Sequence, residues 1–138
     1  MSLRHALAVL AVGAGLAALA GCGAGGSDLA TAPSKLVSPE AFAAAVAEPE
    51  RVTINVHVPD EGSIPGTDLA IPFDQIAAQK SELASLTTPL AVYCRSGRMS
   101  AIAVQILSGL GYTDVVELEG GMIAWEAAGR PLLPPAAG

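Results

Sequence analysis

The sequence has few cysteines and few basic residues. Of its 138 residues only Cys22 and Cys94 are cysteines, and seven are Lys or Arg against 13 Asp or Glu. Only Arg4 of those seven lies in the first 21 residues, so the rest of the chain has six positive and 13 negative residues, a net charge of −7. This acidity argues against nucleic acid and anionic lipid as partners, because both attract basic surfaces.

The first 21 residues have the layout of a secretion signal. Arg4 and His5 form a short basic start, and residues 6–20 are a nearly continuous apolar run, which is too short to span a bilayer. Leu19-Ala-Gly-Cys22 resembles the lipobox of bacterial lipoproteins, whose cysteine is lipidated. We therefore expect a lipoprotein signal peptide at 1–21 and an exported protein, held at the outer face or in the periplasm by a lipid on Cys22. A plain signal peptide and an uncut signal anchor are the alternatives.

The remaining chain is large enough for one domain with a modest core. Residues 22–35 are rich in glycine and small residues, which is typical of a flexible tether after the lipidated cysteine. Residues 132–138 contain Pro134-Pro135 and are expected to be a disordered tail, so the domain occupies 36–131. With Cys22 lipidated, Cys94 is the only free thiol. An unpaired cysteine in an exported protein indicates a reactive thiol or an intermolecular partner.

Strand and helix signals alternate along this domain, which predicts an α/β fold with a parallel sheet. Ser38 and Pro39 have the residue types of a helix cap and a first helical position. Tyr93 and Trp125 lie in apolar stretches and are expected in the core. The predicted strands cover 52–58, 90–93 and 115–118, and the predicted helices cover 38–47, 74–86 in two parts, 98–110 and 122–128.

The stretch Cys94-Arg-Ser-Gly-Arg-Met-Ser100 places a cysteine between an apolar strand and a helix. At such a junction backbone N–H groups can converge on one point, and the positive end of the helix dipole is directed to the same point. Arg95 and Arg98 add positive charge within an acidic chain. These conditions favour the Cys94 thiolate, which is a nucleophile at neutral pH. The alternative is that Cys94 is a small buried hydrophobic residue.

This stretch resembles the active-site loop of the rhodanese-like sulfurtransferases. The match continues into the helix at Ser100 and follows the family's C-terminal pattern through 110–129. The resemblance implies an α/β domain with a central parallel sheet of about five strands and helices on both faces. It also implies that Cys94 takes a sulfane sulfur from a donor such as thiosulfate or a polysulfide, forms a persulfide, and passes the sulfur to a thiol or another thiophilic acceptor. No metal and no organic cofactor is implied, because sulfur is the only group carried.

The resemblance also assigns the loop its role. Its N–H groups would hold the negative charge of the persulfide, and Arg95 and Arg98 would orient the anionic donor. The substrate-binding and anion-binding residues implied in this way are Arg95, Ser96, Gly97, Arg98, Met99 and Ser100.

The first half of the domain departs from the family pattern. Asn55-Val-His57 stands where the family has Asp-x-Arg, so an ion pair that braces the loop is missing. Neutral hydrogen bonds from Asn55 and His57 could replace it. A proton-shuttle role for His57 is the second interpretation, because histidine titrates near neutral pH.

Two other functions are compatible with parts of the pattern. Phosphatases and arsenate reductases use a Cys-x5-Arg loop, but the residue six positions after Cys94 is Ser100, which cannot clamp an oxyanion as arginine does. A non-catalytic or redox-sensing rhodanese-like domain at the cell surface, in contact with a partner protein's thiol, is the other class. The activated thiol argues for catalysis instead.

Overall fold

The computed structural model describes residues 33–138. The predicted signal peptide, Cys22 and most of the predicted tether lie outside this range. The strands are β1 (Lys35–Val37), β2 (Val52–Asn55), β3 (Leu69–Ala70), β4 (Leu90–Tyr93) and β5 (Val115–Leu118). The helices are α1 (Pro39–Val46), α2 (Arg98–Leu110) and α3 (Gly121–Ala127), with a short 3-10 helix η1 at Lys80–Glu82. None of the helices between residues 33 and 138 has the length and apolar character needed to cross a bilayer.

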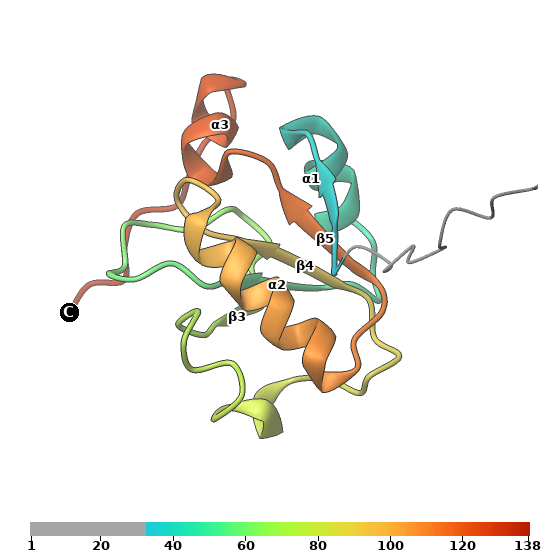
Figure 1. Ribbon diagram of the computed structural model, residues 1–138. Helices are drawn as coiled ribbons and strands as arrows, with labels where there is room; N and C mark the ends of the chain where they lie inside the picture. Colours follow the sequence, from blue (N-terminus) through green and yellow to red (C-terminus); the bar gives the residue numbers. More distant parts are fainter. Residues whose placement is uncertain (1–32) are drawn as a thin grey trace, which may run out of the picture. The chain divides into compact units, whose positions relative to one another are not determined.

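The five strands form one parallel sheet in the order β1-β5-β4-β2-β3 (Figure 1). The central strand β4 is buried along its whole length, as expected for a parallel strand covered on both faces. The register pairs Asn55 of β2 with Tyr93 of β4, so both strands end at the same edge of the sheet. Residues that follow these two strands therefore meet at the carboxyl edge, where α/β proteins place their ligands.

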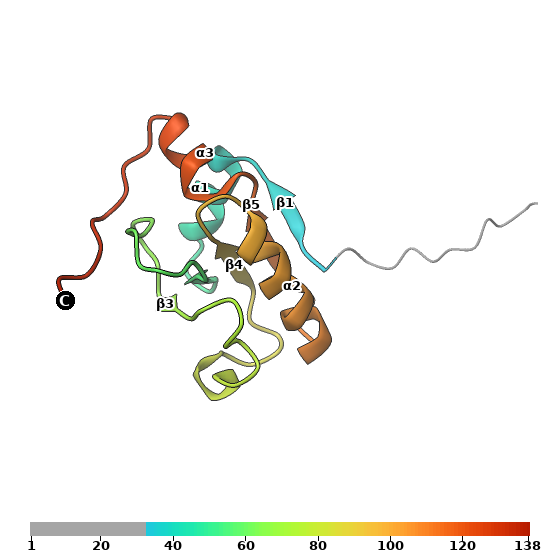
Figure 2. The ribbon, with the colours of Figure 1, turned by 60° about the vertical axis from the view of Figure 1, so that its left-hand side comes forward.

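Helices cover the two faces of the sheet, as Figures 1 and 2 show, with α2 on one face and α1 and α3 together on the other. On the first face Ala103, Val104 and Leu107 of α2 pack into one apolar cluster with residues of β2, β4 and β5. On the second face Phe42 of α1 and Trp125 of α3 pack into a separate apolar cluster. The predicted α/β domain with a five-stranded parallel sheet is thus confirmed.

The predicted helix at 74–86 is wrong. This segment forms turns and only the short helix η1, at Lys80–Glu82. Ile76 and Leu83 are its only buried side chains, so there is no continuous apolar stripe to stabilise a longer helix against the sheet. The strand expected over 52–58 also ends earlier, at Asn55.

The C-terminal segment 132–138, expected to be disordered, is attached to the loop that follows β2. Ser63 and Leu133 exchange two backbone hydrogen bonds of 3.0 and 2.7 Å, and the Ala136 N–H donates to Asp60 Oδ2 at 3.0 Å. The Nε1–H of Trp125 also donates to the Pro131 carbonyl at 2.9 Å. The contacts with Leu133 satisfy the backbone N–H and carbonyl of Ser63 in this irregular loop.

Candidate active site

Cys94 follows directly after β4 and lies at the carboxyl edge of the sheet, with 1% of the residue exposed. The Gly97 N–H donates to its Sγ atom at 3.0 Å. Gly97 has a φ of +100°, a left-handed conformation that glycine adopts without strain, and it immediately precedes α2. An N–H group at the start of a helix is thus directed at the sulfur, which is the anion-holding arrangement expected for a thiolate or persulfide.

The start of α3 fixes the backbone of the same loop. The N–H groups of Met122 and Ile123 donate to the carbonyls of Cys94 and Arg95 at 2.9 and 3.0 Å. Gly121 lies against the loop so closely that a Cβ atom there would collide with the Cys94 carbonyl oxygen. Two hydrogen bonds and a close backbone contact therefore hold Cys94 in one position.

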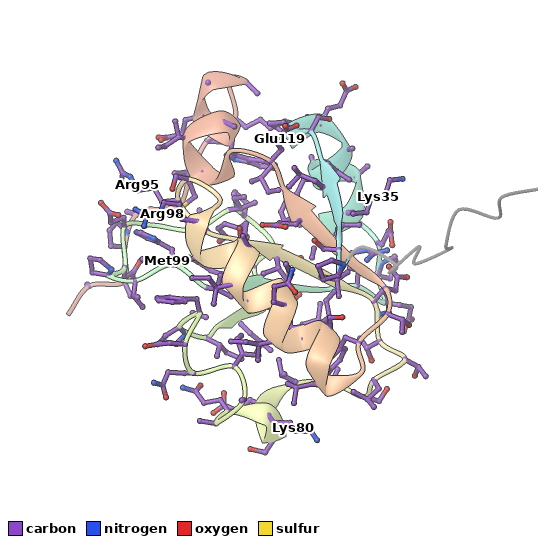
Figure 3. The ribbon with its side chains drawn as sticks, in the orientation of Figure 1. Lys35, Lys80, Arg95, Arg98, Met99 and Glu119 are labelled. Atoms are coloured by element: carbon purple, nitrogen blue, oxygen red, sulfur yellow. The ribbon has the colours of Figure 1, made fainter. Side chains whose placement is uncertain are left out.

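A pocket of about 270 Å³ opens beside Cys94. Its lining combines the two arginines and His57 with apolar side chains. Figure 3 shows Arg95, Arg98 and Met99 close together at the start of α2. The residues around the pocket, besides Cys94, are His57, Phe73, Arg95, Ser96, Arg98, Met99 and Ile102.

The structure brings His57 to this pocket, although no sequence motif pairs it with Cys94. Phe73 and Ile102 were not predicted as site residues. Ile102 lies four residues after Arg98 in α2, so helical periodicity could have placed it on the same face. Phe73 comes from an irregular segment after β3, and no pattern in the sequence marks it.

Glu61 links two of the pocket residues. Arg95 Nη1 donates to Glu61 Oε1 at 2.8 Å, and His57 Nε2 is hydrogen-bonded to the other carboxylate oxygen. The bond from His57 lowers the pKa of Glu61, and the charge of Arg95 acts in the same direction. Arg98 is in none of the four salt bridges found between residues 33 and 138. The charge of Arg95 is therefore paired, and that of Arg98 is not.

Asn55 and Tyr93 attach the loop after β2 to the sheet. Asn55 Nδ2 donates to the Gly62 carbonyl at 3.1 Å, and its Oδ1 accepts from the His57 N–H at 3.0 Å. The buried Tyr93 hydroxyl accepts from the Ile64 N–H at 2.9 Å, and burial raises the pKa of this tyrosine. Asn55 thus forms two neutral hydrogen bonds where the family pattern has an acid, whereas the His57 side chain bonds to the Glu61 carboxylate.

Ser100 and Glu117 are linked to Cys94 but do not line the pocket. Ser100 Oγ is 3.5 Å from Cys94 Sγ and donates to Glu117 Oε1 at 2.7 Å. Sequence reasoning missed Glu117, because a single acidic residue in a four-residue strand gives no signal. In the part of the chain from 33 to 138, no three His, Cys, Asp or Glu side chains are grouped so that they could hold a metal ion.

Comparisons with known proteins identify the family to which this fold and loop belong. The model of the rhodanese-like domain family matches residues 38–128. A sulfurtransferase of Allochromatium vinosum is 33% identical over 103 residues, which cover 72% of this chain and 94% of that protein. A rhodanese-related protein of Thermoplasma volcanium superposes with a TM-score of 0.60 at 26% identity, covering 72% and 97% of the two chains. A rhodanese-like domain protein of Staphylococcus aureus has a TM-score of 0.56 at 28% identity, covering 66% and 90%.

The chain belongs to the rhodanese-like domain family. The family match runs from α1 to α3, covers four of the five strands and includes the whole loop around Cys94. Together with the sulfurtransferase relative, it supports a function of the general sulfurtransferase type.

Proposed function

We propose that the protein transfers a sulfane sulfur from thiosulfate or a polysulfide to a thiophilic acceptor through a persulfide on Cys94. The observation that carries this proposal is the N–H of Gly97, which lies 3.0 Å from Sγ at the start of a 13-residue helix. A sulfur held in this way is stabilised when it is negatively charged, and a thiolate is the form that attacks a sulfane sulfur.

Arg98 supplies the positive charge that an anionic donor meets. It borders the pocket beside Cys94 and has no salt-bridge partner among residues 33–138. Arg95 borders the same pocket, but its guanidinium is paired with Glu61. The donor's charge is therefore recognised chiefly by Arg98 and by the N–H groups of the loop.

The acceptor approaches through the same pocket, since Cys94 is otherwise covered. Phe73, Met99 and Ile102 are its apolar lining residues, so the pocket accepts a thiol with an apolar part as well as a small inorganic acceptor. A protein thiol that presents its cysteine on a narrow projection satisfies the same geometry.

The decisive experiment measures turnover of thiosulfate or polysulfide with cyanide or a thiol as acceptor, in the wild type and in Cys94→Ser. We expect turnover only in the wild type, and mass spectrometry should find one added sulfur atom on Cys94 after exposure to donor alone. Equal rates in the two proteins would refute the proposal. Loading of Cys94 without turnover would favour the sensing or binding function. In separate assays, release of phosphate from a phosphoester, or of arsenite from arsenate and a thiol reductant, would favour the oxyanion enzymes.

We also propose that the domain is exported and anchored to the membrane by a lipid on Cys22. The support is the order of a basic start, an apolar run and the Leu19-Ala-Gly-Cys22 motif. The domain's sulfur chemistry would then take place at the outer face of the membrane or in the periplasm.

A further inference from the structure

The proposed reaction makes no use of a buried carboxyl group that is linked to Cys94 through Ser100. Glu117 is the third residue of β5, and only 6% of it is exposed. Val115, two residues earlier in the same strand, belongs to the apolar cluster under α2. Strand alternation therefore predicts an apolar side chain at position 117. A carboxyl group there costs free energy unless its oxygens are well bonded, so its presence calls for an explanation.

Among residues 33–138, two hydroxyl groups and no cation bond to this carboxyl group. Ser100 Oγ donates to Oε1 at 2.7 Å, and Ser34 Oγ donates to Oε2 at 3.0 Å. Glu117 takes part in none of the four salt bridges in the described range. Within the described residues its carboxylate is therefore stabilised only by neutral donors. Its electrostatic effect reaches Cys94 through the hydrogen bonds of Ser100.

The hydroxyl of Ser100 has a single proton and three neighbours that could share it. Glu117 Oε1 is 2.7 Å away, the Gly97 carbonyl oxygen is 3.2 Å away, and Cys94 Sγ is 3.5 Å away. The charge-assisted bond to the carboxylate is the shortest and strongest of the three. The proton therefore lies toward Glu117, and the oxygen lone pairs face Cys94. In this arrangement Ser100 can accept a hydrogen bond from a thiol but cannot donate one to a thiolate.

We propose that Glu117 is a positioning residue that acts through Ser100 to favour the Cys94 thiol over the free thiolate, and thereby favours the sulfur-loaded state over the empty thiolate. This inference rests on the proposed sulfur transfer. In the loading step the Cys94 sulfur bonds to the outer sulfur of thiosulfate, and the S–S bond of thiosulfate breaks. Its electron pair leaves with sulfite, which takes the thiol proton as bisulfite, and the persulfide retains one negative charge.

The charge distribution explains why loading is favoured. In the empty thiolate the negative charge is on Sγ, within two hydrogen bonds of the Glu117 carboxylate. In the persulfide, Sγ is a neutral divalent sulfur and the charge is on the outer atom, one bond further from Glu117. Repulsion falls with distance, so Glu117 opposes the empty thiolate more than the loaded state. The Gly97 N–H has the opposite effect to Glu117, because it stabilises negative charge in both the thiolate and the persulfide of Cys94.

The effect of Glu117 on Cys94 must be distinguished from that of other charged or titratable groups nearby. Arg95, Arg98 and the titratable His57 line the pocket beside Cys94, and the Glu61 carboxylate bonds to His57 and Arg95. On the other side of the loop, Glu117 and Glu119 border a second cavity, which has a volume of about 450 Å³ and also touches Arg98. Glu119 is exposed and forms no salt bridge in residues 33–138, so it is a natural control for a general charge effect. Figure 3 labels Glu119, which follows the end of β5.

The test compares Glu117→Gln with Glu119→Gln in the absence of any donor. Glutamine keeps the shape and an oxygen that accepts from Ser100, but it removes the charge. We expect the pH at which half of Cys94 is thiolate to fall by about one pH unit in Glu117→Gln, and to move by less than a third of that in Glu119→Gln. The measurement is the thiolate absorbance, together with the pH dependence of iodoacetamide alkylation.

Ser100→Ala provides the second variant if Glu117→Gln does not fold. Removal of the hydroxyl removes the acceptor for the thiol proton, so the thiolate should again appear at lower pH. The double variant should form the thiolate at the same midpoint pH as Ser100→Ala, because both changes interrupt the same hydrogen-bonded path from Glu117 to Cys94. An unchanged or higher midpoint in Glu117→Gln, or an equal shift in Glu119→Gln, would overturn the inference. Alkylation needs no sulfur transfer, so this result is independent of whether the proposed function holds.

Discussion

Arg95 and Glu61, 34 residues apart in the chain, form an ion pair with a distance of 2.8 Å between Nη1 and Oε1. The pair connects the loop around Cys94 to the loop after β2, and His57 bonds to the same carboxylate. Arg95 is therefore partly neutralised beside a pocket that is proposed to take an anion. Two arginines that look equivalent in the sequence have different surroundings in the structure.

Arg98→Ala should weaken donor binding more than Arg95→Ala. Arg98 has no salt bridge between residues 33 and 138, so its loss removes a full charge-assisted contact, and KM for thiosulfate should rise about tenfold. Loss of the paired Arg95 should raise KM by less than about threefold. Steady-state kinetics of both variants at constant ionic strength provide the comparison. Equal effects would show that the ion pair with Glu61 opens when the donor binds.

Glu61→Gln should strengthen donor binding. Removal of the carboxylate leaves Arg95 unpaired beside the pocket, so KM for thiosulfate at neutral pH should fall about threefold. The bond from His57 lowers the pKa of Glu61, so the carboxylate's effect is fully present above its ordinary value near 4.5. The effect is lost only as the pH falls through the lowered value. Glu82→Gln, an exposed change in η1, should leave KM unaltered. A higher KM in Glu61→Gln would mean that the pair is needed to shape the loop.

Gly121→Ala should destabilise the protein and impair the site. Both Gly121 and Gly129 have positive φ values, +59° and +77°, so alanine is strained at either position. A Cβ at Gly129 meets open space, whereas one at Gly121 collides with the Cys94 carbonyl oxygen. Gly129→Ala should therefore cost about 1 kcal/mol of unfolding free energy, and Gly121→Ala at least about 3 kcal/mol. Urea denaturation measures both variants, and equal losses would contradict the close contact.

The free energy of unfolding should decrease at alkaline pH. Burial raises the pKa of Tyr93, and an unfolded tyrosine ionises near pH 10, so the folded protein binds more protons above that pH. The stability associated with this residue is complete below about pH 10 and is lost as the pH rises through the folded value. Tyr93→Phe should flatten this decrease, although it loses about 1–3 kcal/mol at neutral pH because the Ile64 N–H is left unpaired.

The same measurement has an internal check. Burial also raises the pKa of Tyr112, so Tyr93→Phe should keep part of the alkaline decrease and the double Phe variant should lose the rest. Urea unfolding at several pH values between about 8 and 11 covers the required range. If the unfolding free energy of the double variant still decreases with pH as in the wild type, groups other than these two tyrosines cause the decrease.

Cys22→Ala should release the protein from the membrane. Lipid chains anchor a protein by burying methylene groups, and without the thiol no lipid is attached. Fractionation of cells that express the wild type, Cys22→Ala or Cys94→Ala provides the measurement. Only Cys22→Ala should move to the soluble fraction, and a protein that stays with the membrane in this variant would contradict lipidation.

The loop, the helix after it and the central strands could be predicted from local sequence. Cys94 to Ser100 lies between an apolar strand and a strongly periodic helix, so its position at the carboxyl edge follows from neighbouring residues. β1 and β3 have only three and two residues, and their pairing depends on distant strands. Glu61 and Glu117 reach the site from elements 33 and 23 positions away from Cys94, and no local pattern identifies such contacts.

The burial of Cys94 determines which reagents can meet it. With 1% of the residue exposed, a sulfur compound reaches Sγ only by entering a pocket of about 270 Å³. A cysteine on the flat surface of another protein cannot enter this pocket, because the protein around it is wider than the pocket mouth. Small sulfur anions and slender thiols fit. In the proposed reaction the fold would thereby separate sulfur transfer from disulfide cross-linking by size, because a buried thiol is less accessible to oxidants and protein thiols than an exposed one.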